Sequence, residues 1–294
     1  MNKIKTSPGE KIFNALNISF LTLLMFTMVY PIWHILCSSF SNPSLLMGYA
    51  GLLLTPKGFS TEAYRLMSMN PMILRGYLNT IFIVVVGVSI NILFTSIAAY
   101  FLSRKGVLLR DAIMLMIVFT MYFGGGLIPF YFTVKDMGLE NSLWALIVPS
   151  AVSTFNLIIM RTSFMGLPDS LEESARLDGA GHFTILFRIV LPLSKAVIAV
   201  MVLYYAVGHW NAWFNAMLFL HDRKLFPLQL ILREILIQND TSNMMHGVNV
   251  SDQMSVGETI KYAVTVVATL PILCLYPFVQ KYFVQGVMIG ALKG

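Results

Sequence analysis

Long apolar runs, each close to the length of a membrane span, alternate with polar segments along the whole chain. A helix needs about 20 mostly apolar residues to cross the hydrocarbon core of a bilayer. Six segments meet this requirement, at residues 13–37, 78–102, 112–133, 143–161, 194–219 and 260–284. They lack the strict alternation of a membrane β-barrel. The pattern therefore predicts an all-α integral membrane protein, with one domain over residues 1–294 and six transmembrane helices.

Composition supports a membrane protein. The 294 residues are 57% hydrophobic and 12% charged, against about 25% charged residues in soluble domains, and the mean hydropathy is +0.74. The basic residues behind the pI of 9.3 lie between the apolar runs rather than in one patch, which argues against nucleic-acid binding. The first apolar run is too long for a signal peptide and is expected to remain as a span.

Positive charge predicts the orientation. The tight loop 103–111 carries Arg104, Lys105 and Arg110, and short basic loops stay on the cytoplasmic side. Both termini and loop 162–193 are therefore expected in the cytoplasm. On the opposite side we expect the long loop 220–259 and the first outer loop, in which Ser60 would cap a short helix over residues 61–67.

One polar loop, residues 167–192, is predicted to form local structure. Pro168 disfavours helical geometry in the residue before it, and Ser170 with Glu173 has the spacing of a capping box. The sequence predicts a short helix over residues 171–177, held on the membrane surface as a docking element. The glycines expected to take the left-handed conformation after it are Gly179 and Gly181.

The apolar runs carry no obvious means of powering transport. None has an acidic or basic residue far from its ends, although ion-driven transporters usually need such groups inside the membrane. No GxxxxGK[ST] phosphate loop is present, so the chain is not expected to hydrolyse ATP. The five histidines show no metal-ligand spacing, and no nucleophile–base set stands out. Energy is therefore expected to enter from a partner.

Uncharged polar residues inside the spans leave two interpretations open. Such groups form hydrogen bonds between membrane helices, and amides with aromatic faces also suit a path for a hydroxyl-rich solute. His209 is expected to be a satisfied interior histidine, with a pathway role as the alternative. The glycine-rich run 123–131 is either a kink or packing site, or part of the pathway. The pathway candidates are Tyr122, Asn156, Trp210, Asn211 and Asn215.

The polar loop also carries a family signature. Glu173-Ser174-Ala175, three residues, Gly179, nine residues and Ile189–Pro192 fit the pattern EAA-x3-G-x9-I-x-L-P. The chain thus resembles the permease subunits of bacterial ABC importers of type I. LDGAG and the C-terminal QKYFVQGVMIGALKG resemble the maltose-type carbohydrate importers, and FGGGLIP with YPIWHILCSSFS resembles a subgroup for complex or acidic oligosaccharides. Ser174, in place of the middle alanine, is a small change that should preserve docking.

The resemblance implies a multi-pass subunit of a bacterial plasma-membrane sugar importer that works by alternating access. Its implied partners are a second permease subunit, giving a heterodimer, an ATPase dimer and an extracytoplasmic solute-binding protein. No cofactor is expected on this chain, since ATP and Mg²⁺ act through the ATPase. The rival hypotheses are a self-contained secondary transporter and a membrane scaffold or sensor. The identity of the sugar stays open, as does its direct contact with this subunit.

Site residues follow from the resemblance. Glu172 and Glu173 would offer charge to a basic residue of the ATPase, and Leu171 and Ala175 would share an apolar contact face. Parts of residues 236–255 are implied to reach the binding protein. The implied ATPase-coupling residues are Leu171, Glu172, Glu173, Ser174, Ala175, Asp178, Gly179, Ala180 and Gly181. The implied ATPase-contacting tail comprises Gly290, Ala291, Leu292, Lys293 and Gly294.

Overall fold

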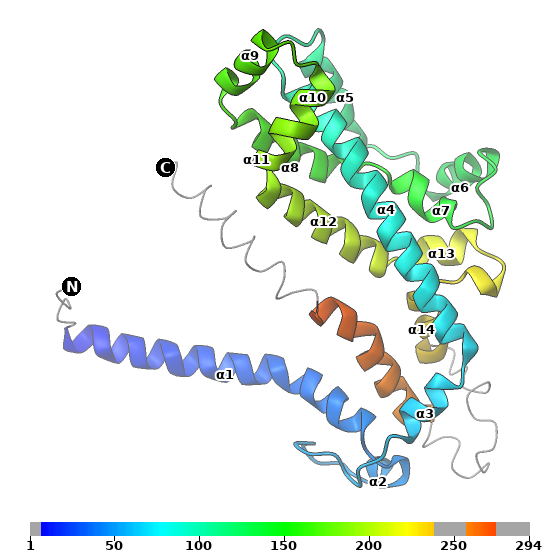
Figure 1. Cartoon of the computed structure of the whole chain (residues 1–294). Coiled ribbons are helices and arrows are strands. Elements are labelled where there is room, and N and C mark those ends of the chain that lie inside the picture. The colour runs from blue at the N-terminus through cyan, green and yellow to red at the C-terminus, as the bar shows by residue number, and fades with distance from the viewer. Residues whose placement is uncertain (1–6, 238–256, 275–294) are drawn as a thin grey trace. The chain divides into compact units, whose positions relative to one another are not determined.

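A computed structural model describes residues 7–237 and 257–274, and these residues are mostly helical (Figure 1). Within them, the only β-type pairing is an isolated bridge between Ser41 and Phe59. The first half comprises α1 (Pro8–Ser39), α2 (Pro43–Met47), α3 (Glu62–Ser68), α4 (Pro71–Ser103), α5 (Arg110–Tyr122), α6 (Leu127–Asp136), α7 (Trp144–Ile147) and η1 (Val148–Ser150). The second comprises α8 (Thr154–Met165), α9 (Asp169–Leu177), α10 (His182–Ile185), η2 (Leu186–Val190), α11 (Leu191–Leu193), α12 (Lys195–Trp210), α13 (Phe214–Phe219), η3 (Arg223–Leu225), α14 (Leu228–Ile237) and the helix Gly257–Cys274.

The described residues divide into two units. The first contains residues 7–70, 235–237 and 257–269, and the second contains residues 71–234 and 270–274. In the first unit, the apolar side chains of α1 are exposed along most of the helix, as expected of a surface that meets lipid. The short helix predicted over residues 61–67 is present as α3. Thr61 occupies the cap position but makes no side-chain cap hydrogen bond, whereas the Ser60 hydroxyl accepts the N–H of Glu62, the first helical residue, at 3.2 Å.

Three helices are each long and apolar enough to span a membrane, namely Pro8–Ser39, Pro71–Ser103 and Gly257–Cys274. They contain the predicted spans 13–37 and 78–102 and the described part of 260–284. Three bent pairs could bring the number of spans to six, with bends of 115° between α5 and α6, 47° between Trp144–Ser150 and α8, and 88° between His182–Leu193 and α12. The helices predicted at 112–133 and 143–161 are therefore corrected to interrupted ones, and the helix predicted at 194–219 is interrupted between the end of α12 at Trp210 and the start of α13 at Phe214.

The glycine run explains the sharpest of these bends. Helix α5 ends at Tyr122, α6 begins at Leu127, and Gly126 between them has φ 87°, in the region that favours glycine. Each glycine costs about 1 kcal/mol relative to alanine in a helix, so three in succession end α5. The run is thus a break in the chain direction, which agrees with the kink interpretation.

Helices α4 and α12 lie beside α8 (Figure 1), and side chains from both form hydrogen bonds with the backbone at the break before α8. The Asn91 amide on α4 donates to the carbonyls of Ser150 and Ala151 at 2.6 and 3.0 Å. The Tyr205 hydroxyl on α12 accepts the Ser153 N–H at 3.0 Å. Backbone groups left unpaired in hydrocarbon cost several kcal/mol each. Asn91 and Tyr205 therefore act in interhelical bonding, and they hold α4, α8 and α12 together.

His209 is a satisfied interior histidine, as predicted. It is 6% exposed, and its Nε2 lies 2.8 Å from Asn91 Oδ1. Gly87 lies directly opposite the ring, where an added Cβ would come within 2.6 Å of Nε2. The absence of a side chain at Gly87 thus permits the close approach of α12 to α4.

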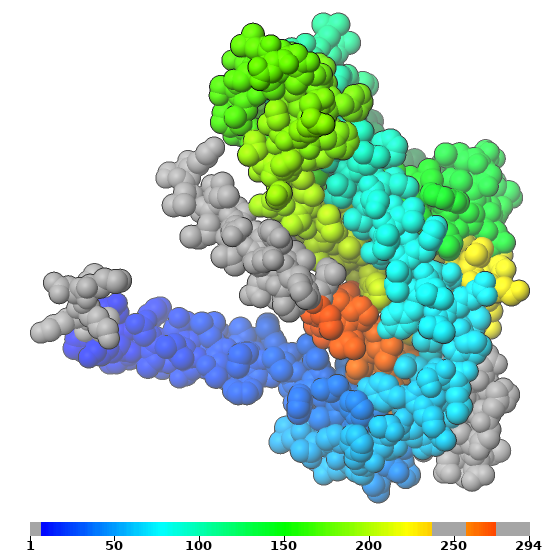
Figure 2. Space-filling model, in the orientation of Figure 1, coloured from blue at the N-terminus to red at the C-terminus, as the bar shows by residue number. Residues whose placement is uncertain are grey.

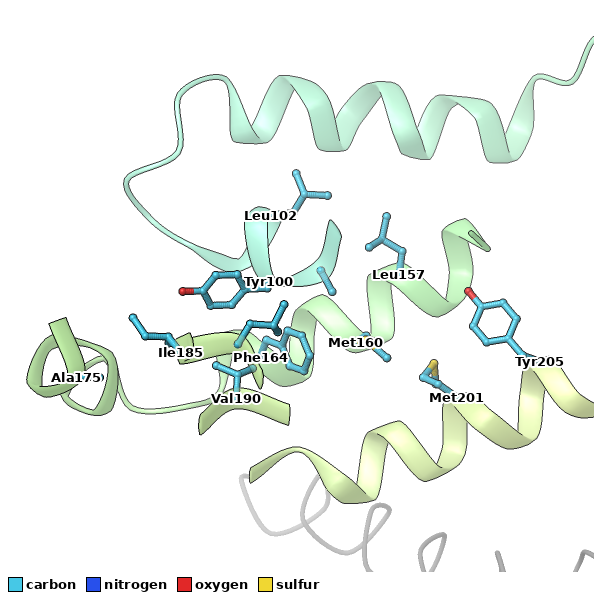
Figure 3. Packing of buried hydrophobic residues seen from close by; sticks show 12 residues of the cluster. Tyr100, Leu102, Leu157, Met160, Phe164, Ala175, Ile185, Val190, Met201 and Tyr205 are labelled. Atoms are coloured by element: carbon cyan, nitrogen blue, oxygen red, sulfur yellow. The ribbon is translucent and has the colours of Figure 1, made fainter. Parts of the chain in front are cut away.

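Much of the apolar core of the second unit lies where α4, α8, α10 and α12 meet (Figure 3). Phe164 and Met160 of α8 are fully buried there, and Tyr100 of α4 and Ala175 of α9 belong to the same cluster. Ala175 thereby ties the short helix α9 to the body of this unit.

Gly87→Ala is expected to lower the free energy of unfolding by about 1–3 kcal/mol, because the new methyl group overpacks the buried His209 ring. Gly208→Ala is the matched control, since its Cβ would have nothing within 4 Å. Thermal unfolding of the purified proteins in detergent measures both. Equal midpoints for the two variants would contradict the close packing at Gly87.

Candidate coupling and pathway sites

Helix α9 begins earlier than the capping-box pattern predicts. Pro168 has extended geometry, with φ −60° and ψ 130°, and Asp169 is the first helical residue. Ser170 is therefore already inside the first turn, and no side chain caps the helix start. The predicted Ser170–Glu173 capping box is thus corrected. The first turn is instead held by Lys105, whose ammonium lies 2.7 Å from the Asp169 carboxylate.

The end of α9 depends on one of the two predicted glycines. Gly179 has φ 82°, and its N–H donates to the Arg176 carbonyl at 3.0 Å. The Ala180 N–H follows, donating to Ala175 at 2.9 Å. Gly181 has φ −77° and precedes α10. The left-handed prediction is therefore confirmed for Gly179 and wrong for Gly181.

The two faces of α9 have different environments. Glu172 and Ala175, three residues apart, are buried against the body of the second unit. Glu173 and Ser174 are exposed, and so is Leu177, at 90%. Glu172 and Ala175 thus face inward, whereas Leu171 is 41% exposed, and the ATPase-coupling role assigned to these residues stays a prediction. Leu177 was missed, although an apolar residue at the end of a polar helix is a usable signal. The part of the second unit that contains α9 is coloured green in the space-filling view (Figure 2).

Glu172 is the centre of a charged network between α9 and α4. Its carboxylate pairs with the Arg104 guanidinium and, at 2.6 Å, with that of Arg176. The Tyr100 hydroxyl donates to the same carboxylate at 3.4 Å. Arg104 also donates to the Phe164 carbonyl of α8 at 3.3 Å. Glu172 therefore attaches α9 to the ends of two long helices.

The charges around Glu172 lower the pKa of its carboxyl by more than burial raises it. Burial by itself would raise the pKa of this carboxyl, but the hydrogen bond from Arg176 and the charge of Arg104 bring the pKa below its ordinary value. Its side chain is 11% exposed and that of Arg104 is 14% exposed. Because solvent screens such a pair little, the link persists in salt.

A cavity of about 650 Å³ lies beside α9, also in the second unit. Glu173 borders it and has no ion-pair partner among the described residues. Helix α9 is thus held by Ala175 and a few charged contacts rather than by close packing along its length. The cavity is lined by Ile97, Tyr100, Phe101, Ser103, Arg104, Lys105, Gly106, Val107, Asp169, Glu172, Glu173, Arg176, His182, Phe183 and Leu186.

The pathway candidates lie on several elements. Trp210 ends α12, the exposed Asn211 follows it, and Asn215 lies in α13, so these three share the elbow between the two helices. Asn156, in the first turn of α8, is 5% exposed, and its amide has no hydrogen-bond partner within the described ranges. Tyr122, at the end of α5, is 75% exposed.

The predicted tail 290–294 and most of loop 236–255 lie outside the described residues.

Glu172→Gln is expected to lower the free energy of unfolding by about 2 kcal/mol at neutral pH, because Arg104 loses its buried carboxylate partner. Since the folded-state pKa is lowered, this stabilisation is complete above the unfolded pKa of about 4.3 and is lost as the pH falls through the folded value. The variant should lack that acid-dependent loss. Thermal unfolding across pH 3–7 measures it.

Asp169→Asn is the control for this experiment. It removes a carboxylate from the same helix, but the Lys105–Asp169 pair is exposed on both sides, so stability should change little. An equal loss in both variants would show that the buried network has no special role.

Comparisons with known proteins agree with this geometry. Residues 73–289 match the family model described as the binding-protein-dependent transport system inner membrane component. The chain is 40% identical to the polygalacturonan/rhamnogalacturonan transport system permease protein YtcP of Bacillus subtilis (strain 168), over 97% of this chain and 99% of that protein. It is also 40% identical to Protein LplC of the same organism, over 100% of this chain and 99% of that protein.

A solved structure shares the fold. It is a chain in the crystal structure of a bacterial ABC transporter involved in the import of the acidic polysaccharide alginate, with 31% identity, a TM-score of 0.90 and coverage of 96% of this chain and 100% of that chain. The apolar spans, the broken helices and the family match lead to one conclusion. This chain belongs to the family of binding-protein-dependent inner membrane permeases of ABC transport systems.

Proposed function

We propose that the chain is one of two permease subunits of an ATP-driven importer and that α9 docks on a separate ATPase. In this arrangement the bent pairs complete six spans, and both termini and α9 face the cytoplasm. The observation that supports docking is the division of α9 into an inward face, with Glu172 and Ala175, and an outward face with Glu173 and Leu177. The Glu173 carboxylate, which forms no ion pair with the described part of the chain, suits a basic side chain, and Leu177 suits an apolar recess.

The structure suggests how docking reaches the membrane. When the ATPase dimer closes, it would move α9, and the Glu172–Arg104 pair would pass that movement to α4. Helix α4 contacts α8 and α12 along its length. A displacement at its end is therefore shared by three elements of the pathway, which is the requirement for alternating access. The cavity beside α9 leaves room for the movement.

The transported solute, in this proposal, is an acidic oligosaccharide delivered by an extracytoplasmic binding protein. Two comparisons support this class, because one relative is named for polygalacturonan and rhamnogalacturonan and the solved structure serves import of an acidic polysaccharide. Galacturonan chains carry a carboxylate on each galacturonate unit. Uncharged amides and aromatic rings in the spans provide hydrogen bonds and flat surfaces for such sugars.

Leu177→Asp and Glu173→Lys are each expected to reduce ATPase co-purification and sugar uptake by at least about tenfold, because each puts an unmatched charge at the docking surface. Membrane insertion should be unchanged. The measurement is the amount of ATPase recovered with the tagged permease, together with uptake of labelled oligogalacturonide by cells.

Leu52→Asp is the matched control, since Leu52 is 71% exposed and lies outside α9. It should retain both ATPase recovery and uptake. Normal ATPase recovery with both α9 variants would rule out this helix as the docking element.

A further inference from the structure

The elbow between α12 and α13 gathers aromatic rings, an amide and a cation from separate helices. Tyr77 of α4 lies 6.0 Å from Trp210, between ring centroids. The guanidinium carbon of Arg233 on α14 lies 4.6 Å from the centroid of the Trp213 ring. We propose that these four residues and Asn211, here called the elbow cluster, form a subsite for a uronate unit of the transported sugar. This inference rests on the proposed function.

Arg233 is the residue that suits an acidic sugar. It is half-buried, and within the described residues its guanidinium has neither an ion pair nor a hydrogen bond to the protein. The adjacent carboxylate of Glu234 is occupied by Arg223 at 2.6 Å. A partly desolvated cation without a carboxylate gains from an anionic ligand. The elbow cluster thus holds a positive charge that the described part of the protein does not neutralise.

The contact with Trp213 leaves the N–H groups of Arg233 available. The guanidinium carbon lies over the indole ring, 4.6 Å from its centroid, and an aromatic ring is not a conventional hydrogen-bond acceptor. A guanidinium has five N–H donors in a planar fork, and two parallel N–H groups match the two oxygens of a carboxylate. Trp213 therefore contacts Arg233 without occupying its hydrogen-bond donors, which favours recognition of a planar carboxylate over a hydroxyl group.

The remaining members suit the body of a sugar. Trp213 is 37% exposed, so part of its ring surface is accessible to a ligand. The C–H face of a pyranose ring is apolar and packs on aromatic rings, while its hydroxyls need donors and acceptors. The exposed Asn211 amide provides both. Trp213 and Asn211 thus supply sugar contacts next to the carboxylate-binding Arg233.

Helix α14 is fixed firmly enough to preorganise Arg233. The Leu228 N–H donates to the Thr80 hydroxyl at 2.9 Å in a buried position. Ile231 packs so closely on Gly76 that a Cβ there would lie 2.6 Å from its Cδ1. The Asn79 amide also donates to the carbonyls of Lys224 and Phe226, before α14. A cation on a fixed helix loses little freedom when it binds a ligand.

The test uses the complete importer, with its ATPase, second permease and binding protein, in cells or proteoliposomes. Uptake of a labelled oligogalacturonide is compared with uptake of its carboxyl-reduced, neutral counterpart. In Arg233→Gln, the ratio of acidic to neutral uptake should fall at least about tenfold, because the acidic sugar loses its hydrogen bonds to a charged group. A loss of at least about tenfold is the effect expected when one such hydrogen bond is removed. Arg233→Lys should retain part of the preference.

Arg65→Gln is the matched control, because the Arg65 side chain is exposed and its ion pair with Glu62 is long, at 4.0 Å. It should leave the uptake ratio unchanged. An unchanged ratio in Arg233→Gln, or an equal loss of uptake for both sugars, would overturn the subsite and assign Arg233 to packing on Trp213. Failure of the wild-type importer to take up either sugar would instead overturn the proposed substrate class.

Discussion

The second unit depends on one constraint, that no backbone polar group inside a bilayer can be left without a partner. Three helix pairs among the described residues are bent at a break, and a break inside hydrocarbon would leave carbonyl and N–H groups that need partners within the protein. Asn91 and Tyr205 satisfy such groups before α8. Because both side chains come from other helices, the break is stable only when the helices are assembled. Asn91 of α4 and Tyr205 of α12 therefore have a structural role, in which they connect their helices to α8.

A different kind of contact dominates at the end of α4. There, α9 is held by Ala175 in the apolar cluster and by the buried carboxylate of Glu172, with a cavity beside it. Close packing would fix α9 more firmly, but it would also resist displacement. Few, strong and localised attachments suit an element that transmits a movement. The elbow of α12 and α13 shows the opposite design, with α14 packed tightly so that Arg233 keeps one orientation.

Much of the architecture could be predicted from hydropathy and from individual breakers. Apolar length identifies α1 and α4, Pro168 and Gly179 bracket α9, and three glycines mark the bend after α5. These signals are local, so a single sequence contains them. The family pattern added the expectation that α9 docks on an ATPase.

The remaining features of the fold and of the candidate sites depended on contacts between residues that are distant in the chain. Arg104 and Glu172 are 68 residues apart, and no local pattern shows that Glu172 rather than Glu173 faces inward. The same holds for Trp213 and Arg233, whose pairing follows from the path of α14. The break before α8 was missed because its carbonyls are satisfied by Asn91, 59 and 60 positions away.

Asp169 and Glu172 of α9 differ in how strongly dissolved ions affect them. The Lys105–Asp169 pair is open to solvent, with side chains 82% and 60% exposed, whereas the pair at Glu172 is shielded. Mobile ions screen exposed charges within a Debye length of about 8 Å at physiological ionic strength. Added salt therefore loosens the start of α9 and spares its middle. The helix would then pivot about Glu172 rather than detach, so its position depends on the ionic strength of the surrounding solution.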